Sequence, residues 1–98
     1  MNIQAMMKQA QAMQKDLKNK KDKINEMEFD GSSSIVSVKV NGKKEVLSVN
    51  IADKESFEKE DLEMLEDMLI SALNEAFKKV DNETKKEMGQ LGGMGDLI

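Results

Sequence analysis

Apolar residues recur every three or four positions along the first quarter of the chain, and this spacing predicts a helix over about residues 3–26. No Gly or Pro interrupts the segment, which is rich in the helix formers Gln, Lys, Ala and Met. The seam consists of Ile3, Met6, Ala10, Met13, Leu17, Ile24 and Met27, with Lys20 at one core position. A helix about 35 Å long with a heptad seam is expected to pack against a second helix, most simply its own copy in a second subunit. The alternative is a helix that packs only on its own sheet.

Three short strands are predicted next. Met27 and Phe29 alternate with acidic residues before the turn dipeptide Asp30-Gly31 and three serines. Apolar alternation then predicts strands over residues 34–40 and 43–51, separated by Asn41-Gly42, the typical signal of a two-residue type I′ hairpin. That closure pairs Val40 with Lys43, Val38 with Glu45 and Val36 with Leu47, so that the apolar faces coincide.

A second helix is predicted over about residues 58–87, with Ser56 as its N-cap. It carries a broad apolar stripe of Leu62, Leu65, Met68, Leu69, Ala72, Leu73, Ala76, Phe77 and Val80. This width suits a helix that covers both a sheet and a dimer partner. From about residue 88 to residue 98, four glycines predict a flexible tail.

These elements predict a single α+β domain over residues 1–98, with α-β-β-β-α order, a three-stranded antiparallel sheet and two long helices. Apolar residues make up 39% of the chain and the aromatics are three Phe, so one subunit has a thin core. We therefore expect a tight homodimer whose long helices project from its body. The predicted dimer interface consists of Ile3, Met6, Ala10, Met13, Leu17, Leu65, Leu69 and Leu73.

The residue types present make catalysis improbable on chemical grounds. The chain has no His and no Cys, so the usual zinc sites and thiolate chemistry are excluded. It also lacks Tyr and Trp, and no Ser lies in a recognisable nucleophile motif. We expect no enzyme, no metal and no cofactor. Glu63, Glu66 and Asp67 share a helical turn and could suggest a cation site, but a solvated acidic face is the simpler interpretation. No apolar run is long enough to span a membrane, so we expect a cytoplasmic protein.

Charge is distributed unevenly. All 15 cations are Lys, and residues 1–27 carry six of them against three acids, whereas residues 53–98 carry six Lys against thirteen acids. Opposite the apolar seam of the first helix, an acid-free stripe of Gln4, Lys8, Gln11, Lys15 and Lys18 is continued by Lys20, Lys21 and Lys23. Such a stripe can bind the phosphates of duplex DNA, although an ordinary solvated helix surface has the same pattern. Without Arg, little direct base recognition is expected.

Four segments, taken in order, resemble the YbaB/EbfC family over nearly the whole chain. They are MMKQAQAMQ (residues 6–14), IVSVKVNGKKEVLSVNI (residues 35–51), MLEDMLISALNEAFKK (residues 64–79) and the glycine-rich ending. The resemblance implies a dimer with projecting helices that binds duplex DNA in the bacterial nucleoid, in an architectural or regulatory role. The alternative function is a protein-interaction module that works with recombination or repair proteins through the projecting helices or the Met-rich tail.

Overall fold

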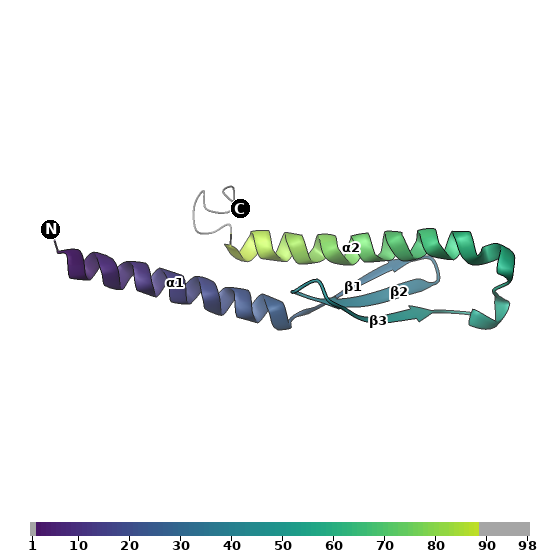
Figure 1. Ribbon diagram of the computed structural model, residues 1–98, viewed down its shortest axis with the longest axis horizontal. Helices are drawn as coiled ribbons and strands as arrows, with labels where there is room; N and C mark the ends of the chain where they lie inside the picture. Colours follow the sequence, from purple (N-terminus) through teal and green to yellow (C-terminus); the bar gives the residue numbers. More distant parts are fainter. Residues whose placement is uncertain (1, 89–98) are drawn as a thin grey trace.

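The computed structural model describes residues 2–88 and has the predicted α-β-β-β-α order (Figure 1). Two long helices enclose three strands and two short 3-10 turns in the sequence. Their bounds are α1 Ile3–Glu26, β1 Glu28–Ser33, β2 Val36–Asn41, β3 Val46–Ile51, η1 Lys54–Ser56, η2 Lys59–Asp61 and α2 Leu62–Met88. The predicted fold class is confirmed. The tail predicted beyond residue 88 lies outside the described residues.

Helix α1 covers the predicted range and projects from the rest of the molecule as an arm (Figure 1). The side chain of Asn2 caps its start by accepting a hydrogen bond from the N–H of Ala5 at 3.3 Å. Ile24, in its last turn, is its one buried residue. The radius of gyration is 19.5 Å, with extents of 72 × 21 × 14 Å, whereas a compact chain of this length has a radius of about 13 Å.

The core lies between α2 and the sheet, whose strand order is β1-β2-β3 with both neighbours antiparallel. Helix α2 packs over β1 and β2. The buried residues of this core are Phe29, Val36, Val38, Val40, Ala72, Ala76 and Val80. Five of the six residues of β3 are exposed, because α2 does not extend over that strand.

The hairpin between β2 and β3 differs from the prediction. Val38 pairs with Val49 and Val36 with Ile51, so the predicted register is wrong. The loop is longer than two residues: the N–H of Lys44 donates to the carbonyl of Asn41 at 2.9 Å, and Lys44, rather than Gly42, has the positive φ, 63°. Lys39 pairs with Ser48 and Val40 with Val46, so the strands form a bulge in which Leu47 of β3 is the extra residue. The apolar faces of the strands still coincide, because the shift preserves the alternation.

The loop is stabilised by Asn41 and by a contact with α1. The side-chain oxygen of Asn41 accepts hydrogen bonds from the N–H groups of Lys43 at 2.9 Å and Glu45 at 3.0 Å. A Cβ atom at Gly42 would lie 1.9 Å from the carbonyl oxygen of Ile24. Glycine is therefore required here by the end of α1 and not by the turn.

Asp30-Gly31 is not a turn, contrary to the prediction. Gly31 lies within β1, where α2 crosses so closely that a Cβ atom would be 2.1 Å from the carbonyl oxygen of Ala72. The turn comes later, at Ser34 and Ile35, and Ser34 has a φ of 53°. The serine-rich segment thus supplies the turn as expected, but the glycine serves helix–sheet packing.

The start of α2 also differs. Ser56 belongs to η1 and is not the N-cap of the long helix, which begins at Leu62. The N–H of Glu58 instead donates to the carboxylate of Asp61 at 3.1 Å, so acidic side chains organise the turns before α2. No helix within residues 2–88 is long and apolar enough to cross a membrane.

Candidate nucleic-acid interface

The polar stripe of α1 is fully presented to solvent. Gln4, Lys8, Gln11, Lys15 and Lys18 are all exposed. Their spacing of three and four residues keeps them on one side of the helix, and the lysines extend over about 15 Å of its axis. Within residues 2–88, no acidic oxygen lies within 4.0 Å of the ammonium groups of Lys8, Lys15 or Lys18. These three cations can therefore meet an anion without breaking an ion pair.

Lys20 differs from the other lysines of α1. Its ammonium group lies 3.6 Å from the carboxylate of Asp16 one turn earlier, and its side chain is only 26% exposed. A partly buried and paired cation is less available to a phosphate than a free one. Lys23 is exposed but lies away from the stripe, in the last turn of the helix.

Lys21 has neighbours that the sequence did not indicate. It lines an open hollow of about 350 Å³ together with Lys43 and Lys44 of the β2–β3 loop and Asp81 of α2. Strand β1 begins two residues after α1 and pairs with β2, so the end of β2 is brought back to the end of α1. A correct prediction of the pairing between β1 and β2 was therefore needed to place Lys43 and Lys44 beside Lys21.

The predicted dimer residues fall into two groups. On α1, Ile3, Met6, Ala10 and Met13 are exposed, and Leu17 is partly buried. On α2, Leu65, Leu69 and Leu73 are partly buried and pack against the core of their own chain. The seam of α1 from Ile3 to Met13 is therefore an apolar surface that nothing in the described chain covers, whereas the α2 leucines already pack on the core of their own chain.

The acidic residues gather at the opposite end of the molecule from the α1 arm. Residues 53–67 contain eight acids and two lysines, and they form η1, η2 and the first turns of α2 (Figure 1). Glu63, Glu66 and Asp67 are each exposed. Within residues 2–88, no group of three or more acidic side chains is arranged to hold a metal ion.

Comparisons with known proteins agree on one group. A model of the YbaB/EbfC DNA-binding family matches residues 1–95. A nucleoid-associated protein from Clostridium novyi is 44% identical over 95 residues, covering 95% of this chain and 82% of the relative. One from Alkaliphilus metalliredigens is 43% identical over 96 residues, covering 95% and 83%. The crystal structure of an uncharacterized Helicobacter pylori protein is similar with a TM-score of 0.74 and 27% identity, covering 94% of this chain and 99% of that one.

Proposed function

The chain belongs to the YbaB/EbfC DNA-binding family, and we propose that it works as a homodimer in the bacterial nucleoid that binds duplex DNA mainly through phosphate contacts. The observation that carries this proposal is the projecting α1 arm, one face of which bears three lysines with no acidic partner among residues 2–88. The protein acts by binding alone, without catalysis. We assign it an architectural or regulatory role, and its relatives are named nucleoid-associated proteins.

Phosphate contact, rather than base recognition, follows from the residue types on the arm. Lysine is a point cation that neutralises phosphates, and each neutralised phosphate releases condensed counterions. The commonest base-specific contact, bidentate Arg to guanine, is unavailable because the chain has no Arg. The arm carries no aromatic side chain that could stack on single-stranded bases. Gln4 and Gln11 can add hydrogen bonds to the same backbone.

The net charge of −4 does not oppose this function. The molecule is 72 Å long and its acidic residues 53–67 lie at the end away from α1. Charges are screened over about 8–10 Å at physiological salt, so the acidic end contributes little to the field at the arm. It also disfavours DNA from lying at that far end of the body.

Dimerisation is supported by apolar surface on β3 and on one flank of α2. Val46, Leu47 and Val49 are 46–49% exposed, and β3 is an edge strand of the sheet. Ile70, Leu73 and Phe77 follow one another at spacings of three and four, in line with Asp81, which contacts the β2–β3 loop. That flank of α2 therefore faces β3. A second copy that covers both surfaces would bury these apolar side chains and could pair with the unpaired backbone groups at the edge of β3.

The exposed seam of α1 favours a second candidate function. Ile3, Met6 and Met13 are 68%, 56% and 46% exposed, and flexible Met side chains suit adaptable protein contacts. If the α1 of a second copy does not cover the seam, a helix of a recombination or repair protein would be its natural partner. Replacement of Met6 and Met13 by Gln separates these functions if sedimentation shows that the variant is still a dimer, because it should then leave DNA binding intact and abolish only a protein contact.

The test is a binding titration of two unrelated duplexes by fluorescence anisotropy between 50 and 200 mM salt. If about four to eight phosphates are neutralised, log K should fall against log salt with a slope of about −4 to −7, equally for both duplexes. Joint replacement of Lys8, Lys15 and Lys18 by Gln should flatten the slope and weaken both complexes alike. Sedimentation at micromolar concentration should give a dimer. A folded, dimeric triple variant with unaltered affinity and slope would contradict the proposal.

A further inference from the structure

A second cluster of lysines lies where the end of α1, the β2–β3 loop and α2 meet. Lys21, Lys43 and Lys44 come from two separate segments and line one open hollow of about 350 Å³. Asp81 is the one acid among the residues that line it. Three cations against one carboxylate leave an excess positive charge in a concave site, whereas the stripe on α1 is convex.

The backbone holds these lysines in place. The side-chain oxygen of Asn41 accepts hydrogen bonds from the N–H of Lys43 at 2.9 Å and from that of Glu45 at 3.0 Å. The N–H of Gly42 donates to the carbonyl of Met27 at 3.1 Å, which fastens the loop to the residue after α1. The end of α1 and the tip of the hairpin are thus joined by a hydrogen bond, so the backbone that carries the three lysines is positioned before any ligand arrives.

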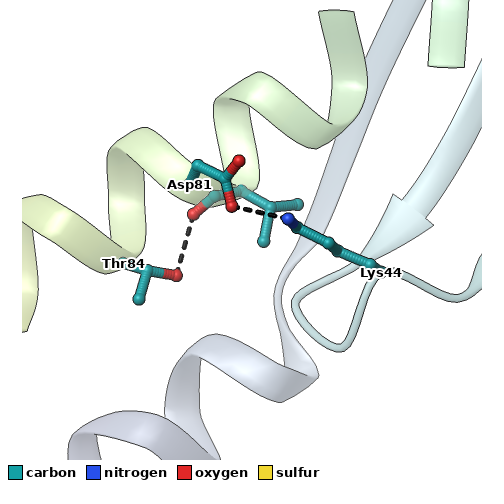
Figure 2. Close-up of polar contacts among 4 residues, drawn as sticks. Lys44, Asp81 and Thr84 are labelled. Carbon is teal, nitrogen blue, oxygen red and sulfur yellow. Dashed lines mark hydrogen bonds and ion pairs between the residues drawn. The ribbon is translucent and has the colours of Figure 1, made fainter. Parts of the chain in front are cut away.

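One of the three cations is already engaged. The ammonium group of Lys44 lies 2.7 Å from the carboxylate of Asp81, and Figure 2 shows the lysine reaching from the loop to α2. In the same view, the hydroxyl of Thr84 donates to the carbonyl of Val80 at 2.8 Å. Lys21 and Lys43 have no acidic oxygen within 4.0 Å among residues 2–88. Two free cations therefore stand beside one that Asp81 holds.

Asn25 adds an unmatched polar group to the site. It lines the same hollow, and its Oδ1 atom is buried with no hydrogen-bond partner within the described chain. Rotation of the amide by 180° would present its NH₂ group in place of the oxygen. A buried amide oxygen without a partner is unfavourable, so a ligand that accepts a hydrogen bond from the NH₂ group would stabilise the rotated form. The carbonyl of Ile24, at the end of α1, is already met by the N–H of Met27 at 3.0 Å.

The hollow continues the stripe on the arm. Lys15, Lys18 and Lys21 are spaced by three residues, so they form an oblique row that runs along α1 towards its end. Lys21 belongs both to this row and to the hollow. A strand of phosphates that follows the row is therefore led to Lys43 and Lys44.

We propose that this hollow is a seat for a backbone phosphate of duplex DNA and that Asp81 limits its strength by competing for Lys44. The inference rests on the proposed DNA binding and extends it from the arm to the body of the protein. Phosphate oxygens would contact Lys21 and Lys43 directly. Lys44 would join them only as its ion pair with Asp81 opens.

The first test compares two double variants of the full chain. Replacement of Lys21 and Lys43 by Gln should weaken binding of a duplex several-fold and reduce the salt slope by about 0.9–1.8, the loss of one or two phosphates. The matched control replaces Lys54 and Lys59, exposed lysines of η1 and η2, and removes the same charge at the far end. It should leave the slope unchanged. Equal slopes for both variants would overturn the proposal.

The second test uses a variant that we expect to bind DNA more tightly. Asp81→Asn frees Lys44 and should tighten DNA binding and steepen the slope by about 0.9. Asp67→Asn adds the same charge on an exposed part of α2 and should not change the slope. If both variants behave alike, the proposed competition is wrong. Circular dichroism checks that each remains folded.

The third arm distinguishes a DNA phosphate from a free one. Inorganic phosphate is titrated into labelled protein at constant ionic strength while the amide signals of residues 42–44 are followed by NMR. We expect these signals to shift with duplex DNA and not with millimolar phosphate. Saturation of the shifts by inorganic phosphate would identify the hollow as a site for a free anion instead. The α1 triple variant is measured in parallel. If it weakens binding while Lys21→Gln with Lys43→Gln does not, this inference fails and the proposed function stands; if the wild type binds no duplex, the proposed function fails.

Discussion

Replacement of Gly42 by Ala should destabilise the fold because the hairpin tip touches the end of α1. A Cβ atom at this position would lie 1.9 Å from the carbonyl oxygen of Ile24, 2.4 Å from its carbonyl carbon and 2.9 Å from the Cα atom of Asn25. All three obstacles are backbone atoms of a helix, so no side-chain rotation can relieve the contact. The variant must instead move the arm away from the loop, which strains the hydrogen bond from Gly42 to Met27.

The magnitude follows from the cost of overpacking. Forcing a methyl group into a filled site costs about 1–3 kcal/mol, and we expect the upper part of this range because the neighbours are backbone. For a domain of this size that corresponds to a fall in melting temperature of roughly 10–20 °C. Thermal unfolding followed by circular dichroism measures it. All variants must be compared at one protein concentration, because the melting temperature of a dimer depends on it.

Two control variants separate this contact from an effect of turn conformation. Gly42→Asn should be as unstable as Gly42→Ala, although Asn tolerates positive φ, because it also carries a Cβ atom. Lys44→Gly should change the melting temperature by only a few degrees. Its relief of the positive φ at residue 44 is offset by glycine's entropy and by the loss of an exposed ion pair with Asp81. A stable Gly42→Asn variant would refute the reasoning and restore the type I′ turn.

Four further predictions concern Gly31, Ser34, strand β3 and the lysines of α1. Gly31→Val should prevent α2 from docking on β1, and we expect loss of the cooperative thermal transition. Ser34→Gly should leave the melting temperature unchanged or raise it, because glycine accepts the φ of 53° at this position without strain. Val49→Glu places a charge on exposed β3 and should convert the proposed dimer to a folded monomer in sedimentation. An intact dimer would show that β3 is not in the interface. Lys18→Gln should reduce the salt slope of DNA binding by about 0.9. Lys20→Gln should reduce the slope by clearly less, because the ammonium group of Lys20 is already paired with Asp16. Equal effects would show that this ion pair opens when DNA binds.

Long-range periodicity predicted the elements well. The bounds of α1 match the prediction because apolar spacing over 24 residues, broken only at Lys20 and free of Gly and Pro, favours a helix throughout. The three strands also occur where alternation is seen. The errors are all at glycine and at the ends of elements. Asn41-Gly42 and Asp30-Gly31 are turn signals when only neighbouring residues are considered, yet both glycines serve contacts with helices that are distant in the sequence.

The candidate site divides in the same way. The stripe of Lys8, Lys15 and Lys18 could be predicted because the period of a helix alone places it on one face. The cluster of Lys21, Lys43 and Lys44 could not, because it depends on the pairing of β1 with β2 and on the loop that follows. A sequence pattern indicates which side chains share an element, whereas the sheet topology decides which elements meet.

The thin core explains why a second subunit is expected, and β3 offers exposed apolar surface beside that core in addition to the α1 seam. Within residues 2–88, eight hydrophobic residues are buried and two of these are Ala, which is a small core for a stable subunit. Alternation along β3 showed correctly which face is apolar, but it could not show that α2 stops short of that strand. The small residues Gly31, Ala72 and Ala76 draw α2 against β1 and away from β3. The close helix–sheet contact at one edge therefore leaves apolar surface at the other, and a second copy is the partner that we expect to cover it.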